Sequence, residues 1–172
     1  MKKIAVIGCA GSGKTTLAQR LQTLLGLPLH HLDQYYWQPH WQQPIFENFA
    51  QLHDQLCDTD SWIIDGMYAR TLYYRCVKAD TIIFLDMPRY RCLWRVIKRL
   101  LKNYKKTTAS SAPECVESID FQFLQWVWNF KKRSHQHILD IIELFGTNKT
   151  IYIFKTNKQV VDFIESLKNY KS

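Results

Sequence analysis

Five short apolar runs recur along the chain, and each is followed by a glycine or a polar residue. They occupy residues 3–7, 29–32, 62–64, 81–85 and 151–154. Their length and their lack of polar alternation are typical of strands that are buried on both faces. We therefore expect five buried strands.

Between these runs the apolar residues follow helical spacing. In residues 15–25 the apolar face is formed by Leu17, Leu21 and Leu24, and Gly26 ends the helix. Further helices are predicted to begin at Pro44, to span residues 89–104, to run from Ser118 or Asp120 to Phe145, and to begin at Asn157. Strands that alternate with helices predict an α/β fold whose parallel sheet is covered on both faces.

The composition fits one globular domain over residues 1–172, with 47% hydrophobic and 22% charged residues. Residues 105–117, rich in Thr, Ser and Ala, are the only stretch typical of a long mobile loop. Lys and Arg number 23 against 15 Asp and Glu, so the net charge is +8. A basic chain favours polyanionic partners, which include nucleotides, nucleic acid and anionic surfaces.

The cysteines indicate a reducing compartment. They are odd in number, spread along the chain and without a CxxC pair: Cys9, Cys57, Cys76, Cys92 and Cys115. This pattern argues against a disulfide framework or a zinc ribbon, and the histidines show no zinc-like spacing. No apolar run reaches the length of about 18 residues that crossing a bilayer requires, and no secretion signal is evident. We expect a cytoplasmic protein with no membrane partner.

Residues 8–15 read GCAGSGKT and match the phosphate-binding pattern GxxxxGK[ST] between a predicted strand and a predicted helix. Gly8, Gly11 and Gly13 would let the backbone curl its N–H groups around a phosphate, at the positive end of the helix dipole. Lys14 would neutralise the β- and γ-phosphates, and the Thr15 hydroxyl would contact Mg²⁺. The sequence thus predicts ATP and Mg²⁺ as cofactors. A glycine-rich turn with a chance lysine is the disfavoured alternative.

Three aspartates end predicted strands. The carboxyl ends of parallel strands lie at one edge of the sheet, so Asp33, Asp65 and Asp86 are expected on the side of the glycine loop. Asp65 best matches an aspartate that holds Mg²⁺ through water. Asp33 is the better candidate to contact or deprotonate an acceptor, and for Asp86 we favour a turn-capping role.

Arginines should surround the transferring phosphate, and the pool is Arg70, Arg91, Arg95, Arg99 and Arg133. Residues 89–106 hold eight Lys or Arg and no acid. This basic segment could equally bind nucleic acid, because Lys and Arg neutralise the phosphates of a nucleic-acid backbone as they do those of a nucleotide.

Aromatic side chains form a second ambiguous set: Trp37, Trp41, Trp126, Trp128 and Phe130. They could stack on bases, but their helical spacing favours packing in the core.

Six blocks of the sequence resemble one known family. They read GCAGSGKTTLAQRL, PLHHLDQYYWQPHW, DSWIIDGMYARTL, ADTIIFLDMPRYRCLWRVIKR, FLQWVWNFKKRS and IYIFKTNKQVVDFIESL. They are similar to successive blocks of the DNA topology modulation (FlaR-type) proteins, part of the adenylate-kinase-related P-loop kinases. The resemblance implies a three-layer α/β/α P-loop NTPase fold, nucleoside-monophosphate-kinase-like, with a five-stranded parallel sheet of order 2-3-1-4-5. It also implies a short helical lid at about residues 100–120.

The resemblance also implies roles for single residues. Gly11, Ser12, Gly13, Lys14, Thr15 and Thr16 would bind nucleotide phosphates, Asp65 would take the Walker B position, and Arg95, Arg99 and Arg133 would belong to the lid region. The HLDQYYW block replaces the monophosphate-binding pattern of adenylate kinases, so AMP does not follow as the acceptor.

Two hypotheses result. The first is a Mg-ATP-dependent kinase for a small, nucleotide- or nucleoside-like acceptor held near Asp33, Trp37 and Trp41. The second is an ATP-binding regulator associated with nucleic acid, in which residues 89–106 lie along phosphates. A bare ATPase is disfavoured because the chain offers no machinery for it to drive.

Overall fold

The structure is a computed structural model that describes residues 1–103, 114–116, 120–146 and 148–169. Its five strands form one parallel sheet in the order β2-β3-β1-β4-β5, as expected. They are β1 (Lys3–Gly8), β2 (Leu29–His31), β3 (Trp62–Asp65), β4 (Thr81–Leu85) and β5 (Thr150–Phe154). The loop expected at 105–117 and the lid expected at about 100–120 fall largely outside the described residues.

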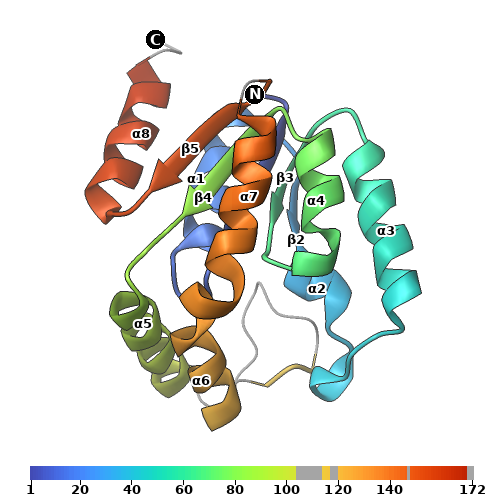
Figure 1. Ribbon diagram of the computed structural model, residues 1–172, viewed down its shortest axis with the longest axis vertical. Coiled ribbons are helices and arrows are strands. Elements are labelled where there is room, and N and C mark those ends of the chain that lie inside the picture. Colours follow the sequence, from blue (N-terminus) through green and yellow to red (C-terminus); the bar gives the residue numbers. More distant parts are fainter. Residues whose placement is uncertain (104–113, 117–119, 147, 170–172) are drawn as a thin grey trace.

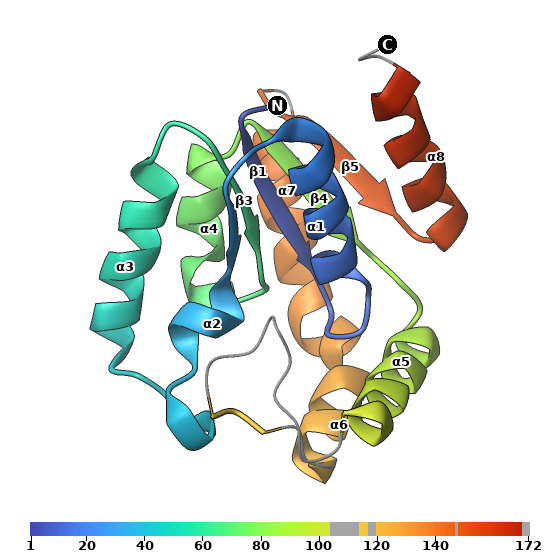
Figure 2. The ribbon, with the colours of Figure 1, turned by 180° about the vertical axis from the view of Figure 1, so that it is seen from behind.

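Helices cover both faces of the sheet. They are α1 (Lys14–Leu25), α2 (Leu32–Tyr36), α3 (Phe46–Asp58), α4 (Ala69–Lys78), α5 (Arg89–Lys102), α6 (Phe121–Trp128), α7 (Gln136–Phe145) and α8 (Asn157–Asn169). Helices α4 and α7, with α3 beside α4, lie on one face, and α1 and α8 lie on the other (Figures 1 and 2). Helices α5 and α6 lie beyond the carboxyl ends of the strands. This arrangement confirms the predicted three-layer α/β/α fold. No helix in the described part of the chain is long and apolar enough to span a bilayer.

The apolar runs are explained by burial between these helices. Ile4 in β1 and Phe84 in β4 are fully buried, because these two strands lie at the centre of the sheet. Leu17 of α1, Leu72 of α4 and Ile138 of α7 belong to the same buried cluster, and these helices cover the two faces of the sheet. The tightly packed core gives the loops at the carboxyl edge a rigid base.

Helix α4 was not predicted from the apolar pattern. Its buried face consists of Thr71, Leu72, Arg75 and Cys76, so two polar side chains interrupt the apolar spacing. A buried polar residue is tolerated only where partners in the tertiary structure satisfy it, and the sequence does not show those partners.

The long helix expected up to Phe145 is interrupted. Helix α6 is followed by a π-helical segment, Lys131–His135, before α7 begins. Asp120 caps α6, since its carboxylate accepts a hydrogen bond from the Gln122 backbone N–H at 2.8 Å. Ser118, the other expected cap, lies outside the described residues.

The core assignment of the aromatic residues is wrong for Trp126 and Trp128, which are 38% and 41% exposed. Phe130 is buried as expected, whereas Trp41 is 37% exposed. The reason is that α6 packs against α5 rather than on the sheet, so it is covered on one side only.

Candidate active site

The glycine-rich loop connects β1 to α1 at the carboxyl edge of the sheet. Gly11 has φ 75° and lies so close to α5 that an added Cβ would stand 2.3 Å from the Cys92 carbonyl oxygen. Gly13, with φ 103°, precedes α1 in the left-handed conformation. Turns of this kind gather successive backbone N–H groups into a concave anion-binding surface. Helix α1 adds the positive end of its dipole there.

The remaining loop residues differ in exposure. Gly8 ends β1, Ser12 is buried with a hydroxyl that has no partner among the described residues, and Thr16 is exposed on α1. The Lys14 ammonium donates to the Cys9 carbonyl oxygen at 2.9 Å, which draws it back across the loop.

Thr15 and Asp65 are joined directly. The Thr15 hydroxyl donates to Asp65 Oδ2 at 2.8 Å, and His31 Nδ1 lies 3.1 Å from the same oxygen. The other oxygen, Asp65 Oδ1, is buried and has no hydrogen-bond partner among the described residues. A buried, unpartnered carboxylate oxygen beside a hydroxyl is an oxygen-rich pair suited to a hard cation such as Mg²⁺.

Sequence reasoning missed His31. Its position follows from the register of the parallel strands, in which His31 of β2 stands opposite Asp65 of β3. His31 ends β2 and Asp65 ends β3, so their contact could be found only once the pairing of those two strands was known.

Asp33 lies in α2, immediately after β2, and accepts a hydrogen bond from the Tyr68 hydroxyl at 2.6 Å. Its side chain keeps exposed surface, but the surrounding protein reduces its hydration, and this raises the pKa of Asp33 above its ordinary value. The Tyr68 hydrogen bond, Lys14 and Arg99 act in the opposite direction, while the negative charge of Asp65 adds to the increase. Asp33 and the glycine-rich loop therefore share one electrostatic environment.

The predicted arginines take up different positions. Arg95 Nη1 lies 3.3 Å from the Ser12 carbonyl oxygen, so α5 places this cation against the loop. Arg99 lies within electrostatic reach of Asp33. Arg133 stacks on α6, with its guanidinium 4.3 Å from the centre of the Trp126 ring, and loss of hydration lowers the pKa of Arg133.

Asp86 is engaged by the π-helical segment. Its two oxygens lie 3.1 Å from Lys131 Nζ and 3.2 Å from His135 Nε2. These contacts connect the carboxyl end of β4 to the segment that carries Arg133.

A recess of about 130 Å³ lies between α2, α3 and α4, close to Asp33. Its walls include Tyr36, Phe49 and Tyr68, whose ring centres are 4.6 to 5.1 Å apart. Arg70 lines the same recess, and its guanidinium lies 3.4 Å from the centre of the Phe46 ring. Among the described residues no carboxylate pairs with Arg70, so the recess combines aromatic walls with an available positive charge.

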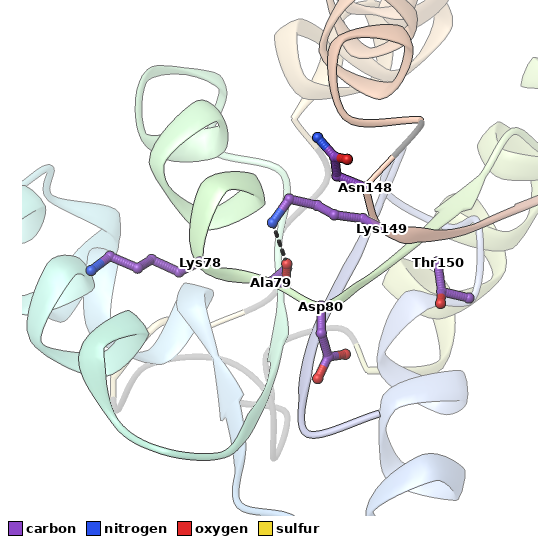
Figure 3. Close-up of a pocket in the computed structure, with 6 residues that line it drawn as sticks. All are labelled: Lys78, Ala79, Asp80, Asn148, Lys149 and Thr150. Carbon is purple, nitrogen blue, oxygen red and sulfur yellow. Dashed lines mark hydrogen bonds between the residues drawn. The ribbon is translucent and has the colours of Figure 1, made fainter.

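The larger hollow lies at the opposite, amino edge of the sheet and is unsuited to catalysis (Figure 3). It has a volume of about 600 Å³ and lies between Lys78–Asp80 and Asn148–Thr150. Its charged groups are already satisfied. Lys149 Nζ donates to the Val77 and Ala79 carbonyl oxygens, and the Asp80 carboxylate accepts from the backbone N–H groups of Lys2 and Lys3.

The strand order, the glycine-rich loop after β1 and the threonine bonded to the aspartate that ends β3 define the fold of the P-loop kinases. No known family model and no curated protein matches the sequence. Solved structures of kinases do match. Shikimate kinase from Acinetobacter baumannii, in complex with shikimate, is 16% identical over 99% of this chain and 92% of its own, with a TM-score of 0.63.

Two structures of deoxyadenosine kinase from M. mycoides are also similar. One, with the products dCMP and a flexible dCDP bound, is 13% identical over 98% of this chain and 99% of its own, with a TM-score of 0.53. The other, with bound dATP, is 14% identical over 96% of this chain and 98% of its own, with a TM-score of 0.52. At these identities the likeness establishes the fold.

Proposed function

We propose that the protein is a Mg-ATP-dependent kinase that transfers the γ-phosphoryl group to a hydroxyl of a small acceptor. The observation that carries this proposal is the hydrogen bond from Thr15 to Asp65, next to Lys14 and the glycine-rich loop. A phosphate loop alone serves many nucleotide-binding proteins. The recess near Asp33, with its aromatic walls and Arg70, would offer an acceptor its own place.

At the ATP end, the residues of the chain supply position and positive charge. The loop N–H groups and the first turn of α1 would hold the β- and γ-phosphates, with Lys14 released from the Cys9 carbonyl to neutralise them. Arg95, already at the loop, and Arg99 and Arg133 would offset charge on the transferring group. The Thr15 hydroxyl and, through water, Asp65 would hold Mg²⁺, which when bound neutralises charge on the phosphate oxygens.

At the acceptor end, Asp33 orients the attacking hydroxyl. The acceptor oxygen forms a bond to the γ-phosphorus, the bond from that phosphorus to the β–γ bridging oxygen breaks, and ADP leaves. Asp33 accepts the proton of the hydroxyl. Its raised pKa makes it a stronger base than an ordinary aspartate, which suits this task.

The acceptor that we propose is nucleotide- or nucleoside-like. The aromatic walls at Tyr36 and Phe49, whose rings meet edge to face, suit a planar ring. The Arg70 guanidinium, which pairs with no carboxylate of the described residues, suits an anionic group. The similar kinases carry deoxynucleotides in one case and shikimate, a ring with a carboxylate, in the other. We place the protein in the cytoplasm, which fits its five free cysteines.

The test is ADP formation from Mg-ATP by purified protein, alone and with nucleoside monophosphates, nucleosides and shikimate as acceptors. One of these should stimulate turnover. Lys14→Ala should reduce that turnover about 100-fold or more, because it removes a charge from the transferring phosphate. Lys158→Ala, an exposed lysine on α8, is the matched control and should have no effect. If Lys14→Ala retains full activity, the assignment is wrong.

A second candidate function, association with nucleic acid, is favoured by the outer face of α5. Tyr90 and Trp94 are 65% and 61% exposed there, and Lys98 Nζ lies 5.1 Å from the centre of the Trp94 ring. Exposed aromatic rings among cations are the elements with which proteins bind single strands. This function predicts affinity for oligonucleotides that falls steeply with salt and is weakened by Trp94→Ala. An affinity that does not change with salt would exclude it.

A further inference from the structure

Arg75 is an arginine buried in the core without an acidic partner. Its side chain has no exposed surface, and no carboxylate among the described residues forms an ion pair with it. Nη2 donates instead to the Gly66 carbonyl oxygen at 2.8 Å and to the Met67 carbonyl oxygen at 3.2 Å. Burying a guanidinium is costly unless hydrogen bonds compensate for the lost hydration, and here the two backbone carbonyl groups accept such bonds.

A third partner of Arg75, His53, holds the guanidinium from the other side. Nη1 lies 3.3 Å from His53 Nε2, and His53 Nδ1 lies 3.0 Å from Asp54 Oδ1. Burial and the charge of Arg75 lower the pKa of His53, so its ring is neutral. His53 therefore donates from Nδ1 and accepts from Arg75 at Nε2. The guanidinium is fixed from α3 on one side and holds the segment after β3 on the other.

The segment that Arg75 holds leads into a strained residue. Tyr68 has φ 22° and ψ 79°, which an L-residue rarely adopts. Gly66, two residues before it, comes so close to Leu32 that an added Cβ would lie 2.9 Å from the Leu32 Cβ. The end of β3 is thus pressed against the residue next to Asp33.

Tyr68 is held at its other end as well. Its ring packs on Tyr36 and Phe49, and its hydroxyl donates to Asp33 Oδ1 at 2.6 Å. Strain that the surroundings maintain is typical of functional sites. The same side chain therefore forms a wall of the recess and sets the orientation of Asp33.

We propose that Tyr68 and Arg75 are positioning residues for the acceptor reaction. Arg75 holds the carbonyl groups of Gly66 and Met67, and this directs the Tyr68 hydroxyl to Asp33 Oδ1. Oδ2 of Asp33 is then the oxygen left to receive the proton of the acceptor. The inference rests on the proposed function, since it assigns residues that orient its base.

The first experiment needs no acceptor. The carboxyl of Asp33 is titrated by carbon NMR in the ligand-free protein, in Tyr68→Phe and in Tyr74→Phe. Tyr74 is the matched control, because its hydroxyl donates to a different carboxylate, Asp58 Oδ1, at 3.2 Å. The groups that face Asp33 are Tyr68, Lys14, Asp65 and Arg99.

Tyr68→Phe should raise the pKa of Asp33, because it removes a hydrogen bond that favours the ionised form, and Tyr74→Phe should leave it unchanged. Arg75→Met should raise it too, if the fold survives, because the Tyr68 hydroxyl is released. An unchanged Asp33 pKa in Tyr68→Phe overturns the proposal, whatever the outcome of the kinase assay.

The second experiment is a double-mutant cycle on acceptor-stimulated ADP formation. Tyr68→Phe should lower kcat at least tenfold in the natural background, while the dissociation constant for ATP stays within twofold. In the Asp33→Asn background, the same substitution should change kcat less than twofold, because Tyr68 acts through Asp33. A merely structural Tyr68 would lower kcat by the same factor in both backgrounds. Absence of any stimulating acceptor refutes the proposed function but leaves the titration result standing.

Discussion

The glycine-rich loop packs so closely on α5 that there is no room for a methyl group at Gly11. The substitution Gly11→Ala therefore tests this contact. The Cβ of Gly11→Ala would lie 2.3 Å from the Cys92 carbonyl oxygen and 3.0 Å from Val96 Cγ2. The first neighbour is backbone, so either the loop or α5 must shift. The left-handed conformation at φ 75° adds a second cost for any residue with a Cβ.

The two costs can be estimated separately. The left-handed backbone costs about 1–2 kcal/mol for alanine, and overpacking of this kind costs about 1–3 kcal/mol. Gly11→Ala should therefore lower the free energy of unfolding by about 2–5 kcal/mol. Gly26→Ala is the matched control, since Gly26 has φ 71° but nothing within 4 Å of an added Cβ. It should cost only the backbone part, about 1–2 kcal/mol.

The assay is urea unfolding of both variants together with the dissociation constant for ATP. Gly11→Ala should be the less stable of the two and should bind ATP more weakly, because the loop is displaced from α5. Gly26→Ala should bind ATP like the natural protein, since Gly26 ends α1 far from the loop. Equal loss of stability in the two variants would refute the claim that α5 is packed directly on Gly11.

Three further predictions follow from single contacts. Thr15→Val keeps the shape of the side chain but removes the hydrogen bond to Asp65. Mg²⁺ should then no longer lower the dissociation constant for ATP, which calorimetry with and without the metal would measure. Asp33→Asn should raise the melting temperature at pH 7. The pKa of Asp33 is raised in the folded state, so the folded protein loses stability as pH rises and this carboxyl ionises. Asparagine carries no charge at any pH and avoids that loss. The gain should vanish below pH 3.8, the ordinary pKa of the group, and a gain that persists there would contradict the argument. Asp86→Asn should weaken the contact with Lys131 and lower the free energy of unfolding in urea by about 1–2 kcal/mol. An unchanged free energy of unfolding would contradict this contact.

Elements with a strong local signal were predictable. The five strands follow from apolar runs, and α1 follows from its spacing and from Gly26, which has φ 71° in the structure. The glycine-rich loop follows from GCAGSGKT, because its glycines allow the backbone turns that form it and Lys14 lies within the same short segment.

Elements that depend on contacts with other parts of the fold were not predictable from the sequence. Helix α4 was missed because Arg75 lies on its buried face, and only the carbonyl groups after β3 and His53 explain why an arginine is tolerated there. The exposure of Trp126 was misjudged because the sequence shows a helical face but not what covers it.

The residues of the candidate site also fall into a group that the sequence predicts and a group that only the fold brings together. The residues that we propose to bind phosphate are consecutive, so the sequence alone singled them out as a group and predicted the fold class. Asp33, Tyr68 and Arg75 are separated in the chain, and no spacing relates them. The parallel register that sets His31 opposite Asp65, and the close approach of Gly66 to Leu32, bring them together. Such contacts join strands and loops that are distant in sequence, so only the tertiary structure decides them.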